Sequence, residues 1–236
     1  MSKKPDKRLT MIRNSVIAGI VLIAVAIVAY GLLRSTAIDV TGEFVEGKQY
    51  KVIPSGAPVP LSGPIRVTEF FSYGCVHCRN FDPEVNDWLA DAPKDVLFER
   101  SPVTFSPTWA LLARSYFALA NTNALEQNHE RIFKAIHDNR KQFPTLESVA
   151  DFVNGYGVTR DEFLRACNSP ATGRSMSEAS RRERALRVVS VPTLTVADHY
   201  EINLEAVPRK KAFEVVDFLV AKIRADRAAR AATTAG

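Results

Sequence analysis

The first strong pattern along the chain is an uncharged hydrophobic run of 18 residues, Val16–Leu33. At ~1.5 Å per residue, a helix of this length spans about 27 Å, which is enough to cross a bilayer. Five Lys or Arg residues precede the run, whereas only Arg34 follows it closely. This asymmetry keeps the N-terminus in the cytoplasm and exports the rest of the chain. We therefore predict one N-terminal transmembrane helix with the main domain outside the cytoplasm.

A cleavable signal peptide is the alternative interpretation of this segment, because small residues occur at positions 24, 26, 35 and 37. We favour an uncleaved anchor, since the run is longer than the ~7–15 apolar residues of a typical signal peptide. Both interpretations export the main domain. A protein dithiol can remain oxidised in such a compartment, where cytosolic reductants do not reach it.

Strand and helix patterns follow a polar-leaning linker. Lys48–Ile53 is expected to open the fold as a short edge strand. Ile65–Phe71 alternates at first and is then apolar apart from Glu69, which suits a central strand covered on both faces. Apolar residues recur at helical spacing from Cys78 onward, and Asp95–Arg100 predicts a second strand.

Helical periodicity alone fills the next 80 or so residues. Strand character returns over Leu186–Val196 and Tyr200–Asn203, and a last helix follows. This order predicts an α/β protein, a thioredoxin fold with an inserted helical domain, preceded by the transmembrane helix. The predicted parts are a cytoplasmic basic N-terminus (1–15), the anchor (16–33), a linker (34–47), the two parts of the thioredoxin fold (48–105 and 188–225), the helical insertion (106–187) and a flexible tail (226–236).

The formal net charge of +5 suggests nucleic-acid binding until it is located. Residues 1–34 contain six of the 31 Lys and Arg residues and one of the 26 acidic residues, so the remainder holds 25 of each. The exported part therefore lacks the excess of basic residues that binds phosphate, and we expect no nucleic-acid partner.

The candidate chemistry is a cysteine pair, because residues 75–78 are Cys-Val-His-Cys at a predicted strand-to-helix junction. Unpaired N–H groups at a helix start stabilise an anion, here the thiolate of Cys75, and His77 adds a donor or a partial positive charge. A stable thiolate favours the reduced form, so the disulfide form oxidises a partner. Cys78, one helical turn further on, is the expected resolving thiol.

Other interpretations of the pair are weaker. A c-type haem site needs a histidine after the second cysteine, where this chain has Arg79. A zinc site needs two more ligands, and the other histidines are scattered. A disulfide that closes so short a loop stabilises a fold only weakly. We expect no cofactor and no metal, and we expect Cys167 to be a buried apolar residue.

Val191 and Pro192 form the second candidate feature. A proline at the head of a strand is typical of a simple edge-strand start. After a helical block and before an apolar strand, it is also the expected place of a cis-proline loop that faces the cysteine pair.

Three segments resemble the DsbA-type periplasmic thiol:disulfide oxidoreductases. They are EGKQY at 46–50, EFFSYGCVHC at 69–78 and VPT at 191–193, and the order of elements is similar over residues 44–225. The resemblance implies Cys75 as nucleophile, Cys78 as resolving thiol and Val191-Pro192 as a cis peptide that borders the site. Val76 departs from the family pattern, in which proline is commoner at this position.

The resemblance also implies a role for Glu69, as a buried acid beneath the pair that relays the proton of Cys78. From the residues alone, a solvent-exposed position on the strand is the alternative. Arg100 stands where the family keeps a basic partner for that acid, and a solvated charge is the alternative there.

The expected function is to introduce disulfide bonds into reduced, unfolded exported proteins. The resemblance implies reoxidation by a DsbB-type membrane quinone oxidase and a place in the bacterial inner membrane, with the catalytic domain in the periplasm. A membrane-tethered reductase or isomerase is one alternative. A metal-binding or partner-binding module that uses Cys75, His77 and Cys78 is another.

Overall fold

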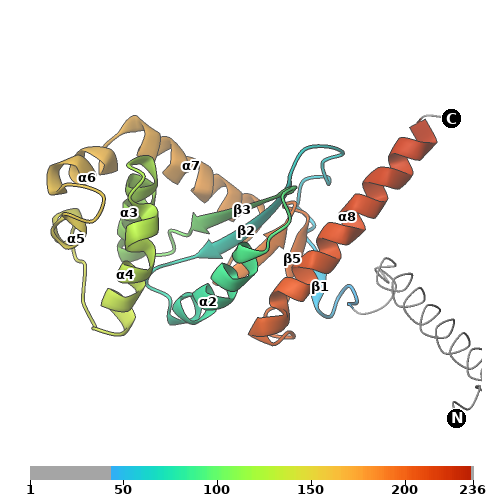
Figure 1. Ribbon diagram of the computed structural model, residues 1–236, viewed down its shortest axis with the longest axis horizontal. Coiled ribbons are helices and arrows are strands. Elements are labelled where there is room, and N and C mark those ends of the chain that lie inside the picture. Colours follow the sequence, from blue (N-terminus) through green and yellow to red (C-terminus); the bar gives the residue numbers. More distant parts are fainter. Residues whose placement is uncertain (1–43, 235–236) are drawn as a thin grey trace, which may run out of the picture. The chain divides into compact units, whose positions relative to one another are not determined.

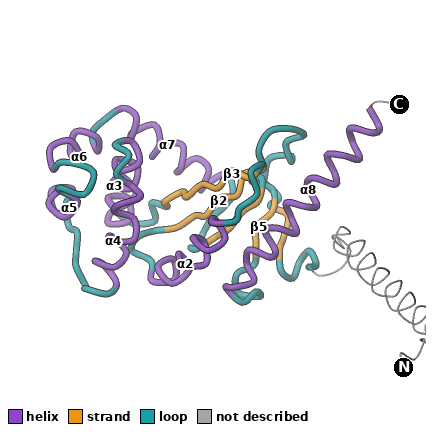
Figure 2. Tube along the Cα trace, viewed as in Figure 1, coloured by secondary structure: helices purple, strands orange, loops and turns teal. Residues whose placement is uncertain are grey.

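The computed structural model describes residues 44–234 (Figures 1 and 2). The predicted transmembrane run at 16–33 lies outside the described residues, as does most of the predicted linker. Among the helices of the described part, none has both the length and the hydropathy needed to cross a membrane.

A five-stranded mixed sheet with the order β1-β5-β4-β2-β3 lies at the centre of the fold. Only β2 and β3 are parallel, and the other neighbours are antiparallel. The expected edge strand, β1, is at one end of the sheet, and β2 lies inside it between β3 and β4. The strands are β1 (Tyr50–Val52), β2 (Ile65–Phe71), β3 (Val96–Pro102), β4 (Thr193–Val196) and β5 (Tyr200–Ile202).

Two helices, α2 (Val76–Ala90) and α8 (Ala212–Thr234), cover one face of the sheet (Figure 1). Ile65 and Val67 of β2 pack in one core cluster with residues of both helices. Side chains alternate between faces along a strand, so Glu69 belongs to this same covered face. Phe70, the residue after Glu69, points the other way and packs in a separate cluster on the opposite face.

Five helices lie between β3 and β4 in the chain and form a helical block beyond the sheet (Figures 1 and 2). They are α3 (Pro107–Asn121), α4 (Leu125–His137), α5 (Leu146–Val153), α6 (Arg160–Cys167) and α7 (Pro170–Ala185), and a short 3-10 turn, η1 (Arg209–Lys211), precedes α8. Four of the five helices have an N-cap residue whose side-chain hydroxyl oxygen accepts a hydrogen bond from a backbone N–H of the first turn. These N-cap residues are Ser106, Thr145, Thr159 and Ser169. The Ser and Thr residues at these N-cap positions therefore determine where the four helices begin.

The core of the helical block is continuous with the cysteine pair. Cys75 and Cys78 belong to the same buried cluster as Phe71, Tyr73 and the inward side chains of α3 to α6. Cys167 lies in this cluster too, fully buried as a free thiol, in the place expected for an apolar residue. The cysteine pair therefore stands where the sheet, α2 and the helical block meet.

Two segments differ from the sequence-based expectation. The predicted strand at Leu186–Val196 begins only at Thr193, because Leu186 and Val188 instead cover the second face of the sheet beside Phe70. The predicted flexible tail from residue 226 continues α8 to Thr234. Alanine and arginine favour helix, and Arg227 in addition donates to the carbonyl oxygens of Pro60 and Gly63.

The central role of β4 is testable with Leu194→Ala. Leu194 is fully buried between the sheet and its covering helices. We expect its truncation to lower the free energy of unfolding by about 2–5 kcal/mol, because it removes apolar contacts and leaves a cavity. Urea unfolding measures this change. Leu97→Ala, at a 42% exposed position of β3, is the matched control and should change it by less than ~0.5 kcal/mol. Equal effects would contradict the assigned packing.

Candidate active site

Cys75 occupies the N-cap position of α2, directly after the turn that follows β2. Its backbone N–H donates to the carbonyl of Ser72 at 3.0 Å, and this bond closes the turn. Cys75 is 8% exposed and Cys78 is fully buried in the first turn of the helix, and both are free thiols. One sulfur thus borders the surface while the other lies beneath it.

The pKa of Cys75 is lowered to about 6. The largest cause is the hydrogen bond from the Cys78 thiol, followed by the backbone N–H groups of Cys78 and His77 and the charge of His77, while burial opposes them. The two backbone donors are unpaired N–H groups of a helix start, which bind an anion well. Cys75 is therefore ionised near neutral pH.

The neighbouring thiol behaves in the opposite way. The pKa of Cys78 is raised far above its ordinary value, first by burial and then by its hydrogen bond to Cys75 and the negative charge there. Because the two sulfurs are so close, ionisation of one suppresses ionisation of the other. The reduced pair carries one negative charge on Cys75 and one proton on Cys78.

The loop before β4 borders the exposed side of the pair. The Val191–Pro192 peptide is cis, and the Val191 carbonyl oxygen lies 3.5 Å from the Cys75 sulfur, where it can accept a hydrogen bond only when that thiol is protonated. Both residues line a groove of about 580 Å³ with His77, which is exposed. The groove extends along the edge strand β1, where Tyr50 and Lys51 line it.

Glu69 is 1% exposed, so the alternative of a solvent-exposed strand residue is wrong, and its charge acts on both Cys75 and Cys78. Its pKa is raised to about 7, chiefly by burial and further by the negative charge of Asp82, while Arg100 opposes the rise. Arg100 Nε donates to Glu69 Oε2 at 3.2 Å, so Arg100 is not a solvated charge. Glu69 can hold or release a proton near neutral pH beside Cys78.

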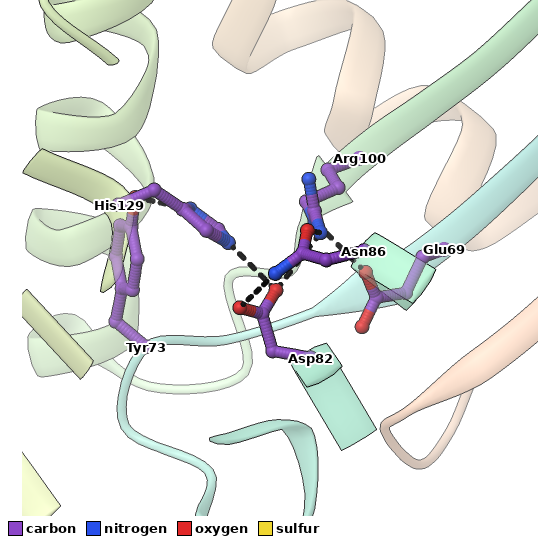
Figure 3. A network of polar contacts seen from close by, with 6 residues as sticks. All are labelled: Glu69, Tyr73, Asp82, Asn86, Arg100 and His129. Carbon is purple, nitrogen blue, oxygen red and sulfur yellow. Dashed lines mark hydrogen bonds and ion pairs between the residues drawn. The ribbon is translucent and has the colours of Figure 1, made fainter. Parts of the chain in front are cut away.

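Arg100 also joins Glu69 to further polar residues (Figure 3). It donates to Asp82 Oδ1 at 2.8 Å and to Asn86 Oδ1 at 3.1 Å, both on α2. Asp82 in turn contacts His129 Nε2 of α4 at 3.1 Å, and His129 Nδ1 contacts the Tyr73 hydroxyl at 2.8 Å. A chain of contacts thus connects β2, β3, α2, α4 and the active-site turn.

Comparisons with known proteins identify the family of this chain. Residues 66–216 match the family described as DSBA-like thioredoxin domain. The chain belongs to the DsbA family. The thiol:disulfide interchange protein DsbA of Pseudomonas aeruginosa is 33% identical over 205 residues, which cover 86% of this chain and 97% of that protein. DsbA of Azotobacter vinelandii is 34% identical over 179 residues, covering 75% and 84%.

Solved structures of DsbA proteins show the same fold. The crystal structure of Pseudomonas aeruginosa DsbA matches with a TM-score of 0.73 and 33% identity, over 78% of this chain and 96% of that one. The oxidoreductase DsbA from Xylella fastidiosa matches with a TM-score of 0.72 and 32% identity, over 78% and 100%.

Sequence reasoning for this DsbA relative missed Tyr73, Asp82, Asn86 and His129. One signal was available, because His129 falls on the inward face of α4 beside Ile132 and Phe133, where a polar residue needs a partner. The identity of that partner was not available, since Asp82 lies 47 positions away. Among the residues that the structure describes, no group of His, Cys, Asp and Glu gathers that could hold a metal ion.

The lowered pKa of Cys75 predicts how the stability of the reduced protein depends on pH. Its folded-state pKa of about 6 lies below the ordinary 9.0. The thiolate therefore stabilises the folded state fully above pH 9, and this contribution is lost as pH falls through 6. We expect urea unfolding to show that reduced wild-type protein gains stability relative to Cys75→Ser between about pH 6 and 9. A constant difference across this range would contradict the assignment.

Proposed function

We propose that this chain is an exported thiol:disulfide oxidoreductase that introduces disulfide bonds into reduced, unfolded proteins. The observation that carries the proposal is the contrasting placement of the two thiols: Cys75 is the N-cap residue of α2, where its pKa is lowered, and Cys78 is fully buried, which raises its pKa. Stabilising the thiolate stabilises the reduced protein, so the Cys75–Cys78 disulfide is a strong oxidant of other thiols. The family relatives carry the name thiol:disulfide interchange protein, which is the same chemistry.

The reaction begins when a substrate thiolate attacks the sulfur of Cys75 in the oxidised protein. The bond to Cys78 breaks, and the Cys78 sulfur takes the electron pair and a proton from Glu69. A second substrate thiolate then attacks the substrate sulfur of the mixed disulfide. The substrate gains its disulfide, and Cys75 leaves as the thiolate held by the N–H groups of α2. The substrate loses two electrons, and the reduced protein is left with the Cys75 thiolate, the Cys78 thiol and the Glu69 carboxylate.

The groove beside the pair suits an extended polypeptide. Val191 supplies a backbone edge at the reacting sulfur, and β1 supplies an exposed strand edge further along the groove. Backbone hydrogen bonding to strand edges accepts many side-chain sequences, which fits unfolded exported proteins as the substrates. Val76 and Val189, 48% and 85% exposed, offer apolar contacts near the site.

Reoxidation requires an oxidant that accepts two electrons from the reduced Cys75–Cys78 pair. We assign this role to a DsbB-type quinone oxidase in the inner membrane. The uncharged run at 16–33 supports a single-pass anchor that keeps the periplasmic domain near this partner. A signal peptide in the same place would release the domain into the periplasm without changing its chemistry.

The first test is the reduction potential of the full chain in detergent, measured by equilibration with glutathione buffers. We expect a value well above the glutathione couple, because the Cys75 thiolate favours the reduced form. A value near that of thioredoxin would overturn the proposal and favour a membrane-tethered reductase.

Cysteine variants separate the roles of the two thiols. Cys75→Ser should abolish disulfide transfer to a reduced test protein, whereas Cys78→Ser should trap a mixed disulfide that non-reducing electrophoresis detects. Cys167→Ser is the matched control, since Cys167 is buried in the helical block and the pKa of its thiol is raised to about 12 by burial. Trapping by Cys75→Ser instead would reverse the assigned roles.

A further inference from the structure

His129 is a buried polar residue that the reaction as described so far does not use. It lies on α4, is 9% exposed, and is packed among the rings of Phe71, Tyr73, Tyr116 and Phe133. Both of its ring nitrogens have partners, with Tyr73 Oη at 2.8 Å and Asp82 Oδ1 at 3.1 Å (Figure 3). Its position is thus fixed from both sides.

The protons of this chain of contacts can be assigned. The pKa of Asp82 is lowered, since the hydrogen bond from His129 and the charge of Arg100 together outweigh burial, so Asp82 is an anion and only accepts. Burial lowers the pKa of His129, so the ring is neutral and carries one proton. That proton must lie on Nε2, which donates to Asp82, and Nδ1 accepts from the Tyr73 hydroxyl.

The His129 contact matters because it affects which of two buried carboxylates carries a proton. Two buried carboxylates, Glu69 and Asp82, share a single cation, Arg100. Asp82 accepts hydrogen bonds from Arg100, Asn86 and His129, whereas Glu69 accepts one from Arg100 Nε. Two anions with one cation in a buried site favour uptake of a proton, and the carboxylate with fewer donors takes it. That carboxylate is Glu69, beside Cys78.

We propose that His129 is a positioning residue, which holds Asp82 as the anion and thereby keeps the shared proton on Glu69, next to the sulfur of Cys78. The proposal rests on the proposed function, in which Glu69 gives that proton to Cys78 as the disulfide opens. Without the His129 donor, Asp82 competes better for the proton. Arg100 then acts on Glu69 alone, and Glu69 loses its proton at lower pH.

The surroundings of His129 keep it neutral while this happens. The groups that face it are Tyr73 from the active-site turn, Asp82 from α2, Arg100 from β3, Tyr116 from α3 and Glu130 from its own helix. Burial and the Arg100 charge lower the pKa of His129, and Asp82 and Glu130 oppose them. The ring is therefore a neutral donor near pH 7.

The test compares the opening of the disulfide in wild-type and variant full chains in detergent. Oxidised protein is mixed with glutathione in single-turnover reactions between about pH 5 and pH 8, and loss of the Cys75–Cys78 bond is followed by tryptophan fluorescence or by alkylation. The ratio of variant to wild-type rate constants cancels the ionisation of glutathione. It reports the protonated fraction of Glu69 in the variant relative to the wild type.

For His129→Leu we expect this ratio to be near 1 at pH 5 and to fall about tenfold by pH 8. Such a fall corresponds to a decrease of about one unit in the pKa of Glu69, the order expected when a buried carboxylate network loses one hydrogen bond. His129→Gln keeps an acceptor for Tyr73 and a donor for Asp82, so it should restore most of the rate at pH 8. A flat ratio for His129→Leu, or equal profiles for Leu and Gln, would overturn the proposal.

Three further measurements make the test specific. If His129→Leu does not fold, His129→Phe takes its place, because it puts another ring among the aromatic neighbours. It should show the fall in the ratio that is expected for His129→Leu. In an Asp82→Asn background, His129→Leu should cause no further change, because the competing carboxylate is absent. His199→Leu, at a histidine that contacts the Ala57 carbonyl outside the network, should leave the ratio at 1.

The proposed function is judged separately on the wild-type chain. If wild-type protein fails to oxidise a reduced test protein, the proposed function is wrong and the role of His129 falls with it. If it does oxidise the test protein while the His129→Leu ratio stays flat, only the role of His129 is wrong.

Discussion

A sulfur anion at Cys75 needs hydrogen-bond donors, and the first turn of α2 supplies them as backbone N–H groups that no helical carbonyl can reach. This requirement governs the local structure. The chain must leave β2 and enter α2 within the turn at 72–74, so that Cys75 takes the N-cap position. Gly74 allows the turn to lie against Trp109, because a Cβ there would approach the indole nitrogen to 2.5 Å.

The same helix turn gives its two thiols opposite environments. Cys75 borders the groove and the Val191 carbonyl, whereas Cys78 points into the core above Glu69 and the covered face of the sheet. Depth alone raises the pKa of Cys78, and the charge on Cys75 raises it further. An anion on one sulfur and a proton on its neighbour is therefore the stable arrangement of the reduced pair.

The sequence predicted the parts of this arrangement that depend on local pattern. The hydrophobic run of β2, the helical spacing after Cys78 and the position of the pair between them all follow from periodicity, and the structure has each of them. Glu69 needed the resemblance, because a single carboxylate in an apolar strand does not reveal whether it is buried. Leu186 and Val188 were mistaken for strand, since apolar residues that cover a sheet are similar in composition to residues within one.

The residues that the sequence did not predict depend on contacts between distant segments. The helical block does more than cover the pair, because α4 contacts both the side chain and the backbone of Tyr73 in the active-site turn. His129 contacts its hydroxyl, and His137 Nε2 contacts its carbonyl oxygen at 2.8 Å. Asp138, just after α4, pairs with Arg79 of α2 at 3.1 Å.

These contacts join the position of α4 to the geometry of the thiols. Any shift of the turn at 72–74 breaks hydrogen bonds on both sides of Tyr73, one of them to a buried histidine that also holds Asp82. Unpaired buried polar groups are costly, so the turn and the network must move together or not at all. Helix α4 thereby helps to hold in place the N–H groups that face Cys75 and the carboxylates of the network. It does so without a hydrogen bond to either sulfur.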